Sequence, residues 1–183
     1  AAERDLETTK KLAEQDLSKL DLEGSNTQTV ALESAYAKAK TSLDIVLTAT
    51  QEALFITEEI IGLRGAGFLE LDLQERNDLR NIYYNPAKTD YEAAIDLQGM
   101  LLVDAPNEAI DEAITATIKA GNSTLVLLSQ TGEALRDITL RSPEQEEYSL
   151  QISSSSSKLS NATLALSELQ TSILHIKTGS SQD

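Results

Sequence analysis

Residues 142–177 have the sequence SPEQEEYSLQISSSSSKLSNATLALSELQTSILHIK, in which apolar side chains recur every seven residues. Two interleaved sets carry the repeat: Ile152, Leu159, Leu166 and Ile173, and beside them Tyr148, Ala162, Leu169 and Ile176. Steps of four and three residues keep one stripe of a helix against a partner helix. We therefore expect a long helix in this segment, with its apolar stripe buried against another helix.

A second stripe with the same spacing lies in the first third of the chain. Its members are Leu32, Ala39, Val46, Ala53 and Ile60, with Tyr36, Leu43, Leu47, Leu54 and Ile61 beside them. These residues predict a helix of residues 26–64. Ser25 and Gln28 have the spacing of a capping box at its start, and Gly65-Ala66-Gly67 is a stop signal at its end.

Start and stop signals between the two stripes predict two more helices. Helix 71–98 begins near Asp72, and Asn85-Pro86 predicts a kink or short break within it, because proline lacks an amide hydrogen and crowds the preceding turn. Helix 105–139 follows Asp104-Ala105-Pro106. Ser142, followed by Pro143, is the strongest predicted helix start, since serine caps free amides and proline suits the first helical position.

The expected fold is all-α: an elongated up-down-up-down antiparallel four-helix bundle with an additional short N-terminal helix. Short connections force sequential helices to run antiparallel. The bundle occupies residues 25–177. The polar, sparsely apolar helix 1–24 is ended by Gly24 and can lie at the periphery, and residues 178–183 form a polar tail. A chain of 183 residues is one domain of ordinary size.

The composition restricts the function. Thirty acidic against fifteen basic residues give a net charge of −15, which repels phosphate backbones and argues against nucleic acid as a partner. The chain has no cysteine, which excludes disulfides, zinc-thiolate sites and cysteine nucleophiles. No stretch approaches the length of an apolar membrane span.

No pattern predicts catalysis, a cofactor or a metal. The only histidine, His175, lies among apolar residues near the chain end, and we interpret it as a surface or partly buried structural residue. One histidine cannot supply the pair of Glu-x-x-His motifs of a di-iron bundle. The segment Asp104–Glu108 is too short for a calcium loop. We therefore expect a protein that is not an enzyme.

The most unusual composition lies in residues 64–91, where arginines and aromatic residues gather. The candidate ligand or partner contacts are Arg64, Arg76, Arg80, Tyr83, Tyr84 and Tyr91. Guanidinium groups beside phenol hydroxyls suit a carboxylate ligand or a protein contact. In the alternative interpretation the arginines pair with nearby acids, Glu70, Glu75 and Asp78, while the tyrosines fill the kink at Pro86.

One stretch carries a resemblance to a known family. Glu75-Arg76 to Leu79, followed by Leu97-Gln98-Gly99-Met100-Leu101-Leu102-Val103-Asp104, is similar to a fragment of flagellins, whose terminal patterns the remaining chain lacks. The expected architecture also resembles the minor pilins of type IV secretion. These likenesses imply a subunit of a bacterial surface or secretion assembly that binds other proteins or copies of itself.

Two hypotheses of function follow. The first is a non-catalytic, extracytoplasmic helical interaction or structural protein. The start Ala1-Ala2-Glu3, without an initiator methionine, fits either a trimmed chain or a mature chain whose signal peptide ended in small residues. The alternative is a periplasmic four-helix-bundle sensor domain of a chemoreceptor or histidine kinase that binds a small carboxylate. The predicted ends at Gly24 and Thr178-Gly179 argue against the sensor, whose first and last helices continue toward the membrane.

Overall fold

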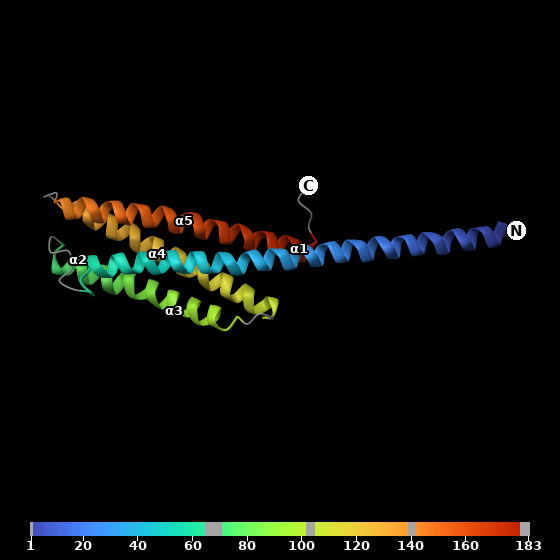
Figure 1. Ribbon diagram of the computed structural model, residues 1–183, viewed down its shortest axis with the longest axis horizontal. Helices are drawn as coiled ribbons and strands as arrows, with labels where there is room; N and C mark the ends of the chain where they lie inside the picture. Colours follow the sequence, from blue (N-terminus) through green and yellow to red (C-terminus); the bar gives the residue numbers. More distant parts are fainter. Residues whose placement is uncertain (1, 65–70, 102–104, 139–141, 180–183) are drawn as a thin grey trace.

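The computed structural model describes residues 2–64, 71–101, 105–138 and 142–179, with side chains from residue 26 onward. It confirms the all-α prediction, with four long helices. The elements are α1 (Ala2–Ile60), α2 (Leu73–Asp78), the π-helix η1 (Leu79–Tyr84), α3 (Asn85–Gly99), α4 (Asn107–Asp137) and α5 (Pro143–Thr178). Figure 1 shows α1, α3, α4 and α5 side by side, each running opposite to the one before it.

Helix α1 corrects one expectation, because it runs without a break from Ala2 to Ile60. The predicted end of a short helix at Gly24, and the capping box that begins at Ser25, are therefore wrong. Glycine inside a helix costs about 1 kcal/mol relative to alanine but keeps its amide hydrogen bond. A helix of 59 residues tolerates one such position.

The C-terminal end of α1 lies four residues before the predicted one. Gly62 adopts φ of 80°, the left-handed conformation that glycine favours. The amide of Leu63 donates to the carbonyl of Glu58 at 2.9 Å and that of Gly62 to Glu59 at 3.3 Å, which is a Schellman motif. The predicted stop at Gly65-Ala66-Gly67 lies outside the described residues.

The helix break predicted at Asn85-Pro86 takes another form. The carboxylate of Asp72 accepts the amide of Glu75 at 2.7 Å and starts α2 as predicted. The chain then passes through η1, where the amide of Asn85 donates to the carbonyl of Arg80, and continues into α3 with Pro86 in its first turn. Proline cannot donate a hydrogen bond, and a π-turn before it accommodates that loss without breaking the helix.

The two last helices begin and end close to the predicted residues. Pro106 is the N-cap of α4, and Ser142 caps α5, its hydroxyl accepting the amide of Gln145 at 3.2 Å. Gly179 ends α5 with φ of 65°. The serine run 153–157 is helical, so the heptad repeat passes through it unbroken.

The core lies where α1, α4 and α5 meet. In the α5 stripe, Ile152, Leu159, Leu166 and Ile173 are buried, whereas Tyr148, Ala162, Leu169 and Ile176 beside them are half-buried. In the α1 stripe, every member except the half-buried Leu32 is buried. Core members with no exposed surface include Ala39, Leu43, Val46, Ala53, Ile60, Ile114, Leu127, Leu128, Leu135, Leu159 and Leu166. Six threonines are also buried: Thr50, Thr57, Thr117, Thr124, Thr131 and Thr163. Of these, Thr50 and Thr57 continue the seven-residue register of Tyr36 and Leu43 on α1. A smaller cluster of Leu47, Ala94 and Ala120 joins α3 to the others.

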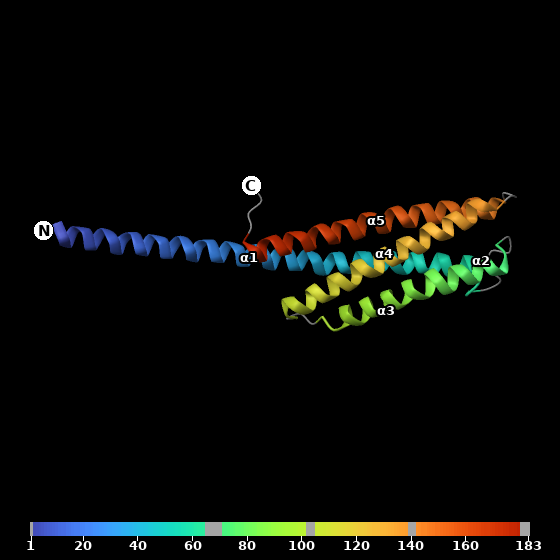
Figure 2. The same ribbon diagram turned by 180° about the vertical axis from the view of Figure 1, so that it is seen from behind.

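The N-terminal part of α1 extends beyond the bundle. Figures 1 and 2, which view the molecule from opposite sides, both show it continuing past the ends of α3, α4 and α5. The side-chain amide of Gln28 donates to the carbonyl of Ile176, in the last turns of α5. We define residues 2–27 as the α1 arm.

Candidate functional site

The structure brings together three of the six predicted contact residues. Arg64, Tyr84 and Tyr91 line a hollow of about 140 Å³ between α1 and α3, together with Gln51, Leu54, Phe55, Glu58, Lys88 and Glu92. Arg76 lies on α2 and is half-buried, Arg80 lies on η1 and is exposed, and Tyr83 packs half-buried against the core. None of these last three is among the residues that line the hollow.

Glu58 is the centre of this hollow. Its carboxylate accepts hydrogen bonds from the Tyr84 hydroxyl and from Nε of Arg64. The guanidinium carbon of Arg64 lies 4.3 Å from the ring centre of Phe55, and Nζ of Lys88 lies 5.8 Å from the ring centre of Tyr84. The cations therefore bind protein groups in a compact network, which we call the Glu58 clasp (Glu58, Arg64, Tyr84).

The pKa values of the clasp follow from its contacts. Burial raises the pKa of Glu58, but the hydrogen bonds from Tyr84 and Arg64 lower it by more, so it lies below the ordinary 4.5. Burial, and then the Glu58 carboxylate, raise the pKa of the Tyr84 hydroxyl far above its ordinary 10.0. The carboxylate is thus held ionised and the phenol neutral.

The polar groups of this hollow bind one another and so connect elements of the fold. Nε of Arg64 already has a carboxylate partner in Glu58, so this guanidinium is part of a contact within the protein. Sequence reasoning predicted acidic partners for the arginines, and Arg64 has one in Glu58, which was not among the predicted partners. Glu70, which was among them, lies outside the described residues. The clasp joins the end of α1 to the π-helix η1.

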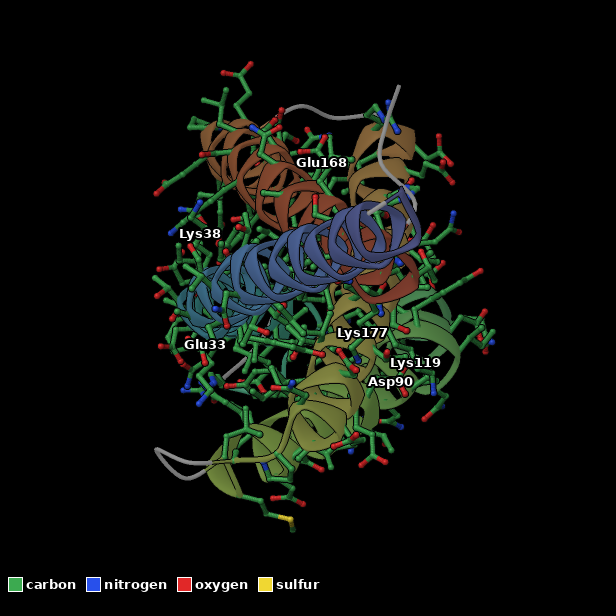
Figure 3. All side chains as sticks on the ribbon, turned by 90° about the vertical axis from the view of Figure 1, so that its right-hand side faces the viewer. Glu33, Lys38, Asp90, Lys119, Glu168 and Lys177 are labelled. Atoms are coloured by element: carbon green, nitrogen blue, oxygen red, sulfur yellow. The ribbon has the colours of Figure 1, made fainter. Side chains whose placement is uncertain are left out.

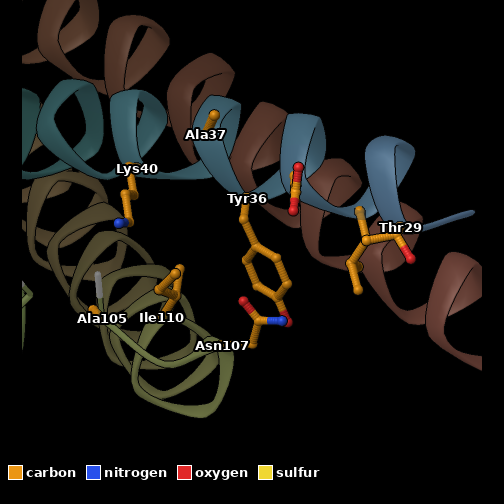
Figure 4. Close-up of a pocket in the computed structure, with 9 residues that line it drawn as sticks. Thr29, Tyr36, Ala37, Lys40, Ala105, Asn107 and Ile110 are labelled. Atoms are coloured by element: carbon orange, nitrogen blue, oxygen red, sulfur yellow. The ribbon is translucent and has the colours of Figure 1, made fainter. Parts of the chain in front are cut away.

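A second concave feature lies at the opposite end of the bundle, at the base of the α1 arm (Figure 4). This groove has a volume of about 350 Å³ and is lined by Thr29, Leu32, Glu33, Tyr36, Ala37, Lys40, Ala105, Asn107 and Ile110. It opens between α1 and the start of α4, beyond the end of α3 at Gly99.

One polar triad fixes the three core helices at this groove. The Tyr36 hydroxyl donates to the two carboxylate oxygens of Asp111 at 3.0 and 3.2 Å, and Nζ of Lys177 pairs with the same carboxylate. Nζ of Lys177 also lies 5.5 Å from the ring centre of Tyr36. Hydrogen bonds to Asp111 and Tyr36 raise the pKa of Lys177 well above its ordinary 10.5. The triad joins α1, α4 and α5 where the arm leaves the bundle.

Further ion pairs connect neighbouring helices along the bundle. Nζ of Lys119 on α4 lies 2.8 Å from Asp90 on α3, whose other carboxylate oxygen accepts the Ser123 hydroxyl at 2.6 Å (Figure 3). Lys158 of α5 pairs with Glu52 of α1 at 2.5 Å. These contacts hold the helices together, and sequence patterns gave no signal for them because their partners are far apart in the chain.

The structure adds two facts on metals and membranes. Among the residues that it describes, no three histidine, aspartate or glutamate side chains are grouped so that they can hold a metal ion. None of the described helices is long and apolar enough to cross a membrane.

No protein-family model, curated protein or solved structure matches this chain.

Proposed function

We propose that the protein is a non-catalytic helical interaction protein, a structural subunit that joins other proteins through the α1 arm. The observation that carries the proposal is the continuation of α1 beyond the ends of α3, α4 and α5 (Figures 1 and 2). An isolated helix is marginal in water, and most helical stability in proteins comes from packing of one face. A projecting helix of this length is therefore expected to gain its stability from a partner.

The bundle supports this role as a rigid base for the arm. The Tyr36–Asp111–Lys177 triad joins α1 to α4 and α5 where the arm begins, so the direction of the arm is fixed by the packed core. The hydrogen bond from Gln28 to the carbonyl of Ile176 adds a further contact at this end. A partner bound to the arm would thus be held at a defined angle to the bundle.

The test compares the full chain with a chain that lacks residues 2–24, both expressed in the native cells. We expect the full chain to elute within an assembly larger than the monomer and the shortened chain to elute as a monomer. Light scattering on the eluted species gives the mass. Equal assembly of both chains would refute the role of the arm.

A second experiment tests the further proposal that the assembly lies outside the cytoplasm: it measures whether protease added to intact cells can cleave the protein.

A sensor domain is the second candidate, and the continuity of α1 favours it. The expected break at Gly24, which argued against a sensor, is absent. The end of α5 at Gly179 still argues against a sensor, because both the first and the last helix of such a domain continue toward the membrane. A thermal-shift screen of carboxylates and amines separates the two functions: stabilisation by several degrees with one ligand class would favour the sensor.

A further inference from the structure

An apolar stripe runs along the α1 arm and continues to Ala31, just beyond it. Positions 6, 10, 13, 17, 20, 24, 27 and 31 follow one another in steps of four and three, and they hold Leu, Lys, Ala, Leu, Leu, Gly, Thr and Ala. Because this segment is helical, residues at that spacing lie on one face. This stripe, which we call the arm stripe, has the spacing of one strand of a coiled coil.

The arm stripe is not the continuation of the bundle core. The core positions of α1 at Tyr36 and Ala39 extend backward in steps of seven along a different face of the helix. On that face the residues are mostly polar: Thr8, Lys11, Gln15, Ser18, Leu22, Ser25, Thr29 and Leu32. The bundle and the arm stripe therefore use separate faces of α1, which indicates separate partners.

Charges are segregated around the arm stripe. Every charged residue at the positions that flank its two sides is acidic: Glu7, Glu14 and Asp21 on one side, Asp16 and Glu23 on the other. Arg4, Lys11 and Lys19 lie on the opposite face of the helix together with Asp5. Lys10 falls within the stripe, and Glu3 precedes it in the same register. Flanking charges decide which helices pair in a coiled coil.

This arrangement disfavours pairing of two copies of the arm. In an antiparallel pair Glu14 would lie opposite Asp21 of a second copy, and Asp16 opposite Glu23. In a parallel pair Asp16 would lie opposite Asp21. Like charges at these positions destabilise either pairing and act against self-association. A helix with lysine or arginine at its flanking positions meets no such repulsion.

We propose that the partner of the α1 arm is a basic amphipathic helix, which pairs with the arm stripe in a two-stranded coiled coil. The proposal rests on the proposed function, since it names the class of partner that the arm binds. Pairing of each acidic flank with a basic one gives the complex its specificity and a dependence on salt.

The test is a charge swap measured by fluorescence anisotropy. One labelled synthetic peptide of about four heptads has leucine at the stripe positions and lysine at the flanking positions. A second peptide has glutamate in place of lysine, and a third has the lysine composition in scrambled order.

The full chain is compared with a variant that carries Glu14→Lys, Asp16→Lys, Asp21→Lys and Glu23→Lys. A matched control carries Asp96→Lys, Asp137→Lys, Glu146→Lys and Glu168→Lys at exposed bundle positions, with the same change in net charge.

We expect the full chain and the matched control to bind the lysine peptide at least about tenfold more tightly than the glutamate and scrambled peptides. The arm variant should reverse the preference between the lysine and glutamate peptides. Equal loss of binding in the arm variant and the matched control, or equal binding of the lysine and scrambled peptides, would overturn the proposal. So would a full-chain dimer that dissociates when residues 2–24 are removed.

The two proposals can fail separately. If removal of residues 2–24 abolishes assembly in cells while the lysine peptide does not bind, the arm joins a partner of another class. If the lysine peptide binds as expected while assembly in cells is unaffected by the removal, the proposed function is wrong although the arm recognises basic helices.

Discussion

Gly121 of α4 lies directly against Thr163 of α5. A Cβ atom placed on Gly121 would come within 2.5 Å of the Thr163 hydroxyl oxygen, closer than real contacts allow. Both residues are buried, at the middle of the interface between the two helices. The absence of a side chain at position 121 therefore permits the close approach of α4 and α5.

Gly121→Ala should destabilise the fold in spite of the better helix propensity of alanine. Overpacking of a core costs about 1–3 kcal/mol, and alanine recovers up to about 1 kcal/mol in a helix interior. We expect a net loss of about 1–2 kcal/mol in the free energy of unfolding, measured in urea. Adding Thr163→Ala should recover most of it, because the clashing atoms are then absent. Additive effects of the two substitutions would show that the residues are not in contact.

Leu166→Ala should lower the free energy of unfolding by about 2–4 kcal/mol, because it leaves a cavity in the core. Leu166 has no exposed surface, whereas Leu164, two residues earlier on the same helix, is 59% exposed. Leu164→Ala is therefore the matched control and should change stability by less than about 0.5 kcal/mol. Comparable losses for both variants would mean that the stripe is not the buried face.

The helices were predictable because heptad spacing and caps are local signals. The same heptad spacing passes through two buried positions of α1 that we did not predict to be in the core, because they hold threonine. Thr50 and Thr57 continue the register of Tyr36 and Leu43, and their hydroxyls donate to the carbonyls four residues earlier at 2.8 and 3.0 Å. A threonine that satisfies its hydroxyl on its own helix can occupy a core position.

The candidate site was only half predictable. The cluster of arginines and tyrosines was visible in the composition, but Glu58, on which the clasp depends, lies 26 residues before Tyr84. The distance between them depends on where α1 ends and on the π-turn, and neither follows from residue spacing. Gly24 shows the opposite error: a residue that ends many helices is tolerated within a long one.

Glu58→Gln should destabilise the fold at neutral pH. The Glu58 side chain is 13% exposed and binds both Tyr84 and Arg64, and loss of a charged hydrogen bond costs about 1.5–3 kcal/mol. Glu52→Gln is the matched control on the same helix. Its ion pair with Lys158 is about half exposed, so we expect less than about 1 kcal/mol.

The contribution of Glu58 should also depend on pH. Its pKa is lower in the folded protein than the ordinary 4.5, so the unfolded chain binds the proton first as the pH falls. The stabilisation is complete above pH 4.5 and is lost as the pH falls below it. In urea titrations from pH 7 to pH 3, the wild-type protein should therefore lose more stability than Glu58→Gln. Parallel curves would contradict the assigned hydrogen bonds.

Tyr36→Phe should affect stability at alkaline pH in the opposite sense. Burial, and then the Asp111 carboxylate, raise the pKa of Tyr36 above its ordinary 10.0 although Lys177 lowers it. The folded protein keeps this proton after the unfolded chain has released it, so stability is complete below pH 10.0 and declines as the pH rises above it. At pH 8 the variant should lose about 1 kcal/mol, because Asp111 no longer receives the hydroxyl hydrogen bond. Between pH 10 and 11 its stability should fall less steeply than that of the wild type, measured by circular dichroism in urea. An equally steep decline would mean that Tyr36 does not keep its proton in the folded state, and the triad at the base of the α1 arm would then need another hydrogen-bond assignment.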